Sequence, residues 1–330
     1  MEVRNVKIIT LQYPHQITNE PLPQMVMALG YFDGIHLGHQ AVIKTAGKIA
    51  EAENKSLAVM TFDPHPSIVL QQEVKHVRLL TPLEEKMALF KALNVDFLFI
   101  VKFSETFAAL SPKQFVQQYL CDLNVVHVVA GFDYRFGQYG AGNMENMLCY
   151  ADGKFEITTV APKELSAEKI SSTRIRAALM EGDCALVEQL LGRHYAIKGV
   201  VVYGDQRGRT IGFPTANLEI NEDYYLPKVG VYAVKAKVDN HWYNGICNLG
   251  FKPTFSETLT EKPIIEVHIL DFDANIYGKM IEVSWYKHIR DEKKFTSVDQ
   301  LITQINQDKQ LAIEFFKLGE SYVAKRSASK

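Results

Sequence analysis

Two histidines near the N-terminus have the residue type and spacing to act on a phosphate chain. The segment Gly30-Tyr31-Phe32-Asp33-Gly34-Ile35-His36-Leu37-Gly38-His39 follows an apolar run and precedes a helical pattern. Glycines let the backbone approach a ligand closely, and the N–H groups of a helix N-terminus attract anions. His36 and His39 could donate hydrogen bonds to charge that develops on a phosphorus centre and its leaving group. The alternative is a turn that happens to contain two histidines.

A second polar segment occurs later in the same half of the chain. In Ile170-Ser171-Ser172-Thr173-Arg174-Ile175-Arg176, hydroxyls stand at an expected helix N-terminus and two arginines follow. Such groups can clamp a triphosphate, although a capped, solvated helix has the same pattern.

Both segments resemble the signature of the nucleotidylyltransferase superfamily, whose members share a Rossmann-like domain and transfer AMP or CMP from a nucleoside triphosphate. The resemblance implies that His36 and His39 are catalytic. It also implies that ATP contacts eight residues: Gly30, Phe32, Asp33, Gly34, Gly38, Ser172, Thr173 and Arg176.

Two further segments each end an apolar run, namely Thr61–Pro66 and Gly131–Gly137. Two prolines stiffen the first segment, and the second carries aromatic residues and an arginine. Rigid loops with core aromatics are the plain interpretation of both. Both also resemble segments of the prokaryotic FAD synthetases, which adenylylate FMN. The resemblance implies flavin contacts from Asp63, His65, Asp133, Arg135 and Phe136, whereas Tyr31 stands where that family usually has asparagine.

A glycine-rich, arginine-containing loop, Gly204–Asn217, occurs in the second half of the chain. It lacks the GK[ST] ending of a Walker P-loop, but backbone N–H groups in such a loop can still surround phosphate oxygens. Thr215 and Asn217, two apart in an extended segment, project oxygens to one side and could ligate Mg²⁺. A plain connection is the alternative.

The run GRTIGFPTAN within this loop resembles the signature of riboflavin kinases, small six-stranded barrels that phosphorylate the ribityl 5′-hydroxyl. The resemblance implies that Thr215 and Asn217 hold ATP–Mg²⁺ and that Glu266 on a later strand is the general base. Glu266 lies in an apolar run, where a carboxylate is costly unless it has a partner or a task. The alternative is that Glu266 faces water, on the same face of the strand as His268. The remaining implied ATP contacts are Gly204, Gly208, Arg209, Gly212, Phe213 and Pro214.

These groups need elements that position them. In the first half, apolar runs alternate with helical patterns, which predicts βαβ units and a parallel sheet whose ligands bind beyond the carboxyl ends of the strands. The expected strands are Val26–Phe32, Leu57–Phe62, Phe97–Phe103, Val125–Ala130 and Phe155–Val160, and the expected helices are His39–Glu53, Leu83–Leu93 and Pro112–Leu120.

The pattern changes near residue 171. Two helices are expected in Ile170–Leu191 around Gly182, and a last one at Val298–Leu318. Successive strands without intervening helices predict an antiparallel barrel or sandwich. They are Tyr195–Tyr203, Val229–Val238, Trp242–Leu249, Ile264–Leu270 and Met280–Tyr286. We therefore expect an α/β Rossmann-like domain at 1–185 and, as the resemblance implies, a six-stranded antiparallel β-barrel with a terminal helix at 186–330.

Composition excludes several classes of protein. The 330 residues suit about two domains, and 36 Lys and Arg against 38 Asp and Glu give a net charge of −2, without the basic excess typical of nucleic-acid binding. No apolar run is long enough to span a bilayer, and no signal-peptide pattern opens the chain. The four cysteines are far apart and show no CxxC spacing, which favours buried thiols in a reducing, cytoplasmic compartment.

The two resemblances together cover essentially the whole chain, in the order of bifunctional riboflavin kinase/FAD synthetases. They imply that riboflavin and ATP give FMN and ADP in the second domain. They further imply that FMN and ATP give FAD and pyrophosphate in the first, with neither nucleic acid nor membrane as partner. An aminoacyl-tRNA synthetase, a single-activity enzyme and a flavin-binding module without catalysis are the alternatives. The sequence does not predict the oligomeric state.

Overall fold

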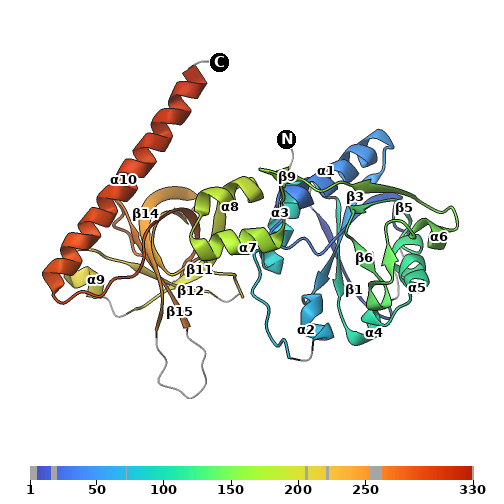
Figure 1. Ribbon diagram of the computed structural model, residues 1–330, viewed down its shortest axis with the longest axis horizontal. Coiled ribbons are helices and arrows are strands. Elements are labelled where there is room, and N and C mark those ends of the chain that lie inside the picture. Colours follow the sequence, from blue (N-terminus) through green and yellow to red (C-terminus); the bar gives the residue numbers. More distant parts are fainter. Residues whose placement is uncertain are drawn as a thin grey trace. The chain divides into compact units, whose positions relative to one another are not determined.

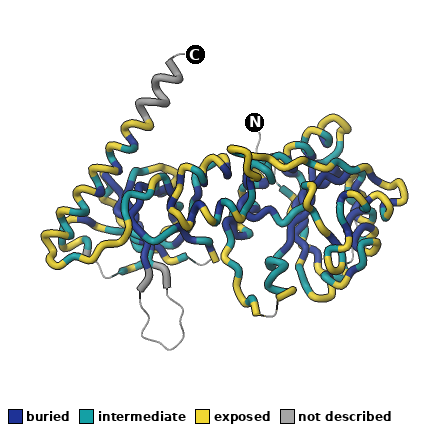
Figure 2. The backbone as a smooth tube through the Cα atoms, viewed as in Figure 1, coloured by how far each residue is buried: buried dark blue, intermediate teal, exposed yellow. Residues whose placement is uncertain are grey.

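The computed structural model describes residues 6–15, 21–71, 73–204, 207–220, 223–252 and 262–328. The chain divides into two compact units, Met1–Ser172 and Thr173–Lys330 (Figure 1). The tube in Figure 2 shows that the strands of each unit are largely buried and that the helices expose their outer faces. Each unit therefore has its own core.

The first unit contains a six-stranded sheet in the order β1-β4-β3-β2-β5-β8. All five neighbouring pairs are parallel, which confirms the predicted Rossmann-like architecture. The central strand β2 is buried along its whole length, as expected for a sheet covered on both faces. The strands are β1 (Lys7–Gln12), β2 (Met25–Leu29), β3 (Ser56–Asp63), β4 (Phe97–Lys102), β5 (Val125–Gly131) and β8 (Glu156–Val160).

Helices cover both faces of this sheet, because alternate β2 side chains enter two different cores. Val26 and Ala28 pack with residues of α1 (Leu37–Ala52) and α3 (Leu83–Ala92). Met25, Met27 and Leu29 pack on the other face with residues of α5 and η1. The remaining elements of this unit are α2 (Pro66–Leu70), α4 (Glu105–Ala108), α5 (Pro112–Val116), η1 (Gln117–Cys121), β6 (Arg135–Phe136), η2 (Gln138–Gly140), β7 (Gly142–Asn143), α6 (Leu148–Ala151), β9 (Glu164–Leu165) and β10 (Glu168–Lys169).

Two helices, α7 (Ser172–Glu181) and α8 (Cys184–Leu191), flank the predicted break at Gly182. Gly182 has a φ of 79°, which favours glycine, and a Cβ there would lie 3.2 Å from the His288 ring. The helix α8 packs against β11 and β16 of the second unit. The contact division at Ser172 and Thr173 therefore lies earlier in the chain than residue 185, which falls inside α8.

The second unit is a closed antiparallel barrel in the order β11-β12-β15-β14-β13-β16, and it confirms the predicted barrel. Alternate residues of β11 are buried, as a filled small barrel requires. The strands are β11 (Tyr195–Val202), β12 (Ala216–Glu219), β13 (Gly230–Val238), β14 (His241–Lys252), β15 (Lys262–Ile269) and β16 (Met280–Arg290).

The predicted terminal helix is present as α10 (Val298–Ala328) and follows the last strand. Arg290 of β16 forms a bidentate ion pair with the buried carboxylate of Asp308 on α10, with Nη2 to Oδ2 at 2.8 Å. Ala312 and Phe316 of the same helix pack against Ala233 and Ile246 of the barrel. Polar and apolar contacts thus attach α10 to the barrel wall. A short helix, α9 (Arg207–Thr210), lies in the glycine-rich loop.

Candidate active sites

The loop that carries the two histidines leaves the carboxyl end of β2 in a constrained conformation. Phe32 and Ile35 have φ values of 57° and 38°, a region that side chains rarely adopt and that costs of order 1–3 kcal/mol per residue. The neighbouring Asp33 is buried, and its carboxylate accepts hydrogen bonds from the backbone N–H groups of Leu80 and Thr81 at 3.2 and 3.0 Å. The surrounding structure therefore holds the loop in place.

His36 ends this loop and caps α1. Its Nδ1 accepts a hydrogen bond from the backbone N–H of His39 at 3.2 Å, so that the neutral ring carries its proton on Nε2. The rings of His36 and His39 stack with centroids 3.6 Å apart. A Cβ at Gly38 would lie 3.0 Å from the His36 ring, so the turn needs a small residue there. The two imidazole rings therefore stack nearly parallel to each other at the N-terminus of α1.

His39 is held neutral. Burial is the main cause that keeps the pKa of His39 well below its ordinary value, and the positive charges of Lys86 and Lys169 add to it. Its Nδ1 is buried and has no hydrogen-bond partner among the described residues. A buried polar atom without a partner costs free energy, which a bound phosphate oxygen would recover. This orphaned nitrogen supports the predicted role in binding phosphate.

Ser172, an expected ATP contact, lies beside the histidine loop. Its hydroxyl donates to the backbone carbonyl of Asp33 at 2.8 Å, and so it joins the start of α7 to the histidine loop. Thr173 and Arg176 fall in the second unit by the contact division. The guanidinium carbon of Arg176 lies 5.7 Å from the Tyr225 ring centroid.

The predicted flavin-binding residues follow β3 and β5. His65 caps α2 through Nδ1, and its ring meets the Tyr31 ring edge-on at 4.5 Å between centroids. Asp133 pairs with Lys169 Nζ at 2.5 Å, while Arg135 is exposed. Phe136 is only 5% exposed and packs in the core, which fits the plain interpretation of that residue.

A buried lysine that the motifs do not include, Lys86, also borders this site. Lys86 of α3 is 2% exposed, and its Nζ donates to the Tyr31 carbonyl at 3.1 Å. Burial lowers the pKa of Lys86 to about 8, against the opposing influence of Asp33 and Asp63. A charged group with this degree of burial is rare unless it has a partner or a task.

In the barrel unit, strand register places three polar residues side by side. Glu266 of β15 lies directly opposite Asn217 of β12 on one side and opposite Asn248 of β14 on the other. Directly opposed residues have Cβ atoms about 4.5–5.5 Å apart, within reach of hydrogen bonding. Thr215 immediately precedes β12, two residues before Asn217. Glu266 therefore belongs to a polar row, to which Asn248 is an addition that the sequence did not reveal.

The glycine-rich loop packs closely over this row. A Cβ at Gly204 would collide with the Asn217 side chain, and one at Gly208 would collide with the Phe213 carbonyl. Gly212 has a φ of 89°, which favours glycine. His268 Nδ1 lies 2.8 Å from the Pro214 carbonyl and anchors the loop from β15, and burial lowers the pKa of His268.

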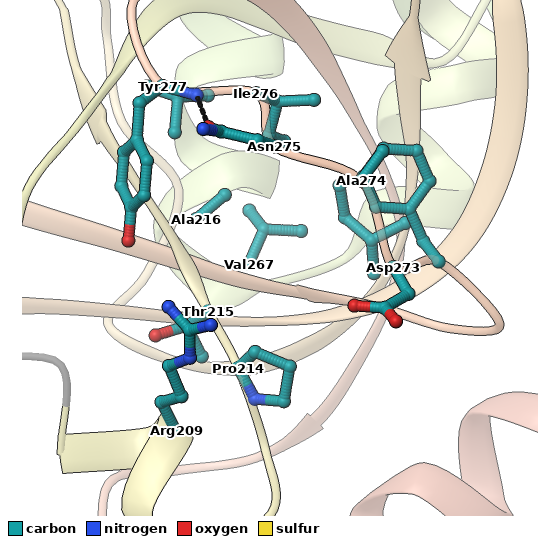
Figure 3. A pocket seen from close by; sticks show the side chains of 13 residues that line it. Arg209, Pro214, Thr215, Ala216, Val267, Asp273, Ala274, Asn275, Ile276 and Tyr277 are labelled. Atoms are coloured by element: carbon teal, nitrogen blue, oxygen red, sulfur yellow. Dashed lines mark hydrogen bonds between the residues drawn. The ribbon is translucent and has the colours of Figure 1, made fainter.

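Beside the loop is a cavity of about 290 Å³ (Figure 3). The apolar side chains of Val201, Val267 and Ile269 line it. Figure 3 shows Arg209 and Thr215 next to each other on one side of the cavity. The segment 273–277 also lines the cavity and ends at Tyr277, whose ring stacks on Tyr203 with centroids 3.9 Å apart. An apolar cavity with an arginine at its edge suits a planar base that carries phosphates.

The residues also fit a magnesium ion bound together with a nucleotide. Mg²⁺ is usually held by one or two protein oxygens plus substrate phosphates, which the Thr215 hydroxyl and the Asn217 amide can supply. No group of three or more His, Cys, Asp or Glu side chains in the described part of the chain could hold a metal ion by itself.

A parallel nucleotide-binding sheet with a histidine pair, followed by a small barrel with a glycine-rich loop, defines a two-part enzyme class that acts on nucleoside triphosphates. Residues 18–174 match the family described as FAD synthetase, and residues 191–316 match the family described as riboflavin kinase. The chain belongs to the bifunctional riboflavin kinase/FMN adenylyltransferase family.

Individual relatives agree with this membership. The bifunctional riboflavin kinase/FMN adenylyltransferase of Bacillus subtilis is 52% identical over 311 residues, which cover 94% of this chain and 98% of the relative. That of Listeria monocytogenes is 49% identical over 93% of this chain and 98% of its own length.

A crystal structure from Streptococcus pneumoniae, described as a macrolide-efflux protein, has a TM-score of 0.85 and 37% identity, and covers 93% of this chain and 99% of that one. Its description names a different activity from that of the other relatives, but its fold is the same. None of the helices in the described ranges combines the length and the apolar character needed to cross a membrane.

Proposed function

We propose that the chain makes FAD from riboflavin in two ATP-dependent steps, one in each unit. The barrel unit phosphorylates riboflavin to FMN, and the sheet unit adenylylates FMN. The observation that carries this proposal is that each unit has its own groups for phosphate chemistry, the stacked His36–His39 pair in one and Glu266 between two asparagines in the other. Binding alone would need no carboxylate in that row.

In the kinase step, Glu266 accepts the proton of the riboflavin 5′-hydroxyl as its oxygen attacks the γ-phosphorus of ATP. The bond between that phosphorus and the bridging oxygen breaks, and ADP leaves. The adenine of ATP occupies the cavity beside Tyr277. The phosphates lie along the loop, whose Arg209 and Pro214 line the cavity. The other loop residues that contact them are Gly204, Gly208, Gly212 and Phe213. Thr215 and Asn217 would hold Mg²⁺, which neutralises phosphate charge when bound.

In the adenylyl transfer, a phosphate oxygen of FMN attacks the α-phosphorus of a second ATP, and pyrophosphate leaves. A phosphate monoester is already ionised at pH 7, so the step needs no protein base. His36 and His39 donate hydrogen bonds to the charge that develops. Thr173 and Arg176 orient the triphosphate, and Ser172 fixes the start of α7. The backbone between Gly30 and Gly38, with Phe32, Asp33 and Gly34, shapes the loop.

FMN binds beyond the carboxyl ends of β3 and β5, where ligands of parallel sheets lie. Asp63, His65, Asp133 and Arg135 contact it there, while the buried Phe136 supports the loop from below. All four cysteines are free thiols, which supports a reducing compartment and hence a cytoplasmic location.

Because each unit is proposed to catalyse one of the two reactions, we expect a fragment of residues 173–330 to convert riboflavin to FMN and to make no FAD. This fragment retains α8, which packs on β11 and β16. A fragment of residues 186–330 cuts α8 within its first turn, so we expect it to unfold at a lower temperature. Thermal unfolding by circular dichroism and chromatography of the flavin products measure both effects. A folded 173–330 fragment without kinase activity would show that the assignment of chemistry to units is wrong.

A further inference from the structure

Lys86 carries a charge in the interior of the sheet unit, beside the histidine loop. It lies on α3, four residues before the fully buried Phe90 and therefore on the same helix face. At 2% exposure its ammonium group is removed from water, which costs free energy unless the protein compensates. Core packing alone would be served better by an apolar side chain of similar length.

The contacts of Lys86 converge on the first peptide of the histidine loop. Its Nζ donates to the Tyr31 carbonyl at 3.1 Å and lies 3.7 Å from the centroid of the Tyr31 ring. The Thr61 hydroxyl donates to the same carbonyl at 2.8 Å. Donors from α3 and β3 thus fix the backbone immediately before Phe32, where the strained part of the loop begins.

The charge of Lys86 also reaches the histidines. It is one of the causes that lower the pKa of His39, so the ammonium and the imidazole interact electrostatically. The other groups that face Lys86 are the carboxylates of Asp33 and Asp63, which favour its charged form and keep its pKa near 8 in spite of burial. Lys86 is therefore mostly protonated at pH 7 and loses its charge as the pH rises through about 8.

We propose that Lys86 is a positioning residue for adenylyl transfer, which holds the Gly30–His36 loop through the Tyr31 carbonyl and places a fixed positive charge behind the His36–His39 pair. This rests on the proposed function of the sheet unit. A charge in a low-dielectric interior stabilises negative charge at a reacting phosphate more strongly than a surface charge does. His36 accepts a hydrogen bond at Nδ1 and His39 is held neutral, so the ammonium group of Lys86, which interacts electrostatically with His39, supplies positive charge that the two rings do not carry.

The test is the pH profile of FAD synthesis from FMN and ATP–Mg²⁺ between pH 6.5 and about 9.5. In the unmodified chain, kcat should fall as the pH rises through about 8, because Lys86 loses its proton there. Lys86→Met should lower kcat by about 10- to 100-fold, the worth of a hydrogen bond to a charged group, and should abolish the alkaline decline. Lys86→Arg should move the decline to higher pH, because a guanidinium stays protonated. His39 cannot produce the decline, since its pKa lies well below this range.

Two variants of the same unit separate the charge from a structural effect. Thr61→Val removes the other hydrogen bond to the Tyr31 carbonyl and leaves the charge, so it should lower kcat and keep the alkaline decline. Lys91→Met removes an exposed lysine from the last turn of the same helix and should change nothing. The rate of riboflavin phosphorylation, measured in the same samples, should be unaffected by all of these substitutions.

Three results would overturn the proposal for Lys86. The first is an unchanged kcat and pH profile in Lys86→Met, and the second is the unmodified alkaline decline in Lys86→Arg, which remains informative if the methionine variant does not fold. The third is an identical pH profile of kcat in Thr61→Val and Lys86→Met. It would show that Lys86 acts only through its hydrogen bond to the loop and not through its charge. If the unmodified chain makes no FAD from FMN at any pH, the assignment of adenylyl transfer itself fails, a result distinct from these three.

Discussion

Replacement of both His36 and His39 by alanine should stop FAD formation and leave FMN formation intact, so that FMN accumulates from riboflavin. Each lost donor to a developing charge is worth about 10²–10³ in rate. The two rings stack at 3.6 Å and His36 caps the peptide N–H of His39, so their effects should not simply multiply. A time course of both flavins by chromatography measures the effect.

Two control variants accompany this double variant. His36→Asn retains a side chain that can cap α1, so a large loss of adenylylation in this variant shows that capping is not the whole role of His36. His127→Asn alters a buried histidine of β5 that contacts Thr158 on β8, and it tests whether any buried histidine in the unit is required. Undiminished FAD synthesis in the double alanine variant would contradict the proposed role of His36 and His39 in adenylyl transfer.

Glu266→Gln should lower the rate of riboflavin phosphorylation by about 10²–10⁴, the usual contribution of a general base. The amide keeps the size of the side chain and can still accept a hydrogen bond from the hydroxyl, so the affinity for riboflavin should change little. When FMN is supplied directly, FAD synthesis should be normal, because that step belongs to the other unit. The decisive comparison is the kinase rate against riboflavin affinity, measured by fluorescence titration.

Glu219→Gln is the matched control, since Glu219 is an exposed glutamate at the end of β12. It should leave both the rate and the affinity unchanged. If Glu266→Gln loses riboflavin binding together with the rate, Glu266 is a structural partner of Asn217 and Asn248. If it loses neither, Glu266 merely faces water.

Periodicity and motif spacing predicted most of the fold, and the exceptions have physical causes. The edge strand β1 was not predicted, because most of its residues are not buried and its apolar pattern is weak. The strand β12 has only four residues and begins within the glycine-rich motif, so it is too short to show an alternating apolar pattern. Both strands are defined by pairing with distant segments, β4 in one case and β11 and β15 in the other.

The structure brings together those candidate site residues that are close in sequence. His36 and His39 are three apart, and their spacing alone indicated a shared target. Lys86 shares the buried face of α3 with Phe90, and a lysine at the spacing of a buried aromatic residue is the one sequence signal that points to it. Asn248 and the cavity border at 273–277 depend on strand register and chain closure, which no local pattern contains.

The most direct test of two-step FAD synthesis is to incubate the unmodified chain with riboflavin, ATP and Mg²⁺ and to follow the flavins by chromatography. We expect FMN to appear first and FAD to follow, and FMN supplied in place of riboflavin to give FAD and pyrophosphate. FMN without FAD, or FAD from FMN without any phosphorylation of riboflavin, would show that only one unit is active. Riboflavin that binds but is recovered unchanged would contradict catalysis by either unit and identify the chain as a flavin-binding protein.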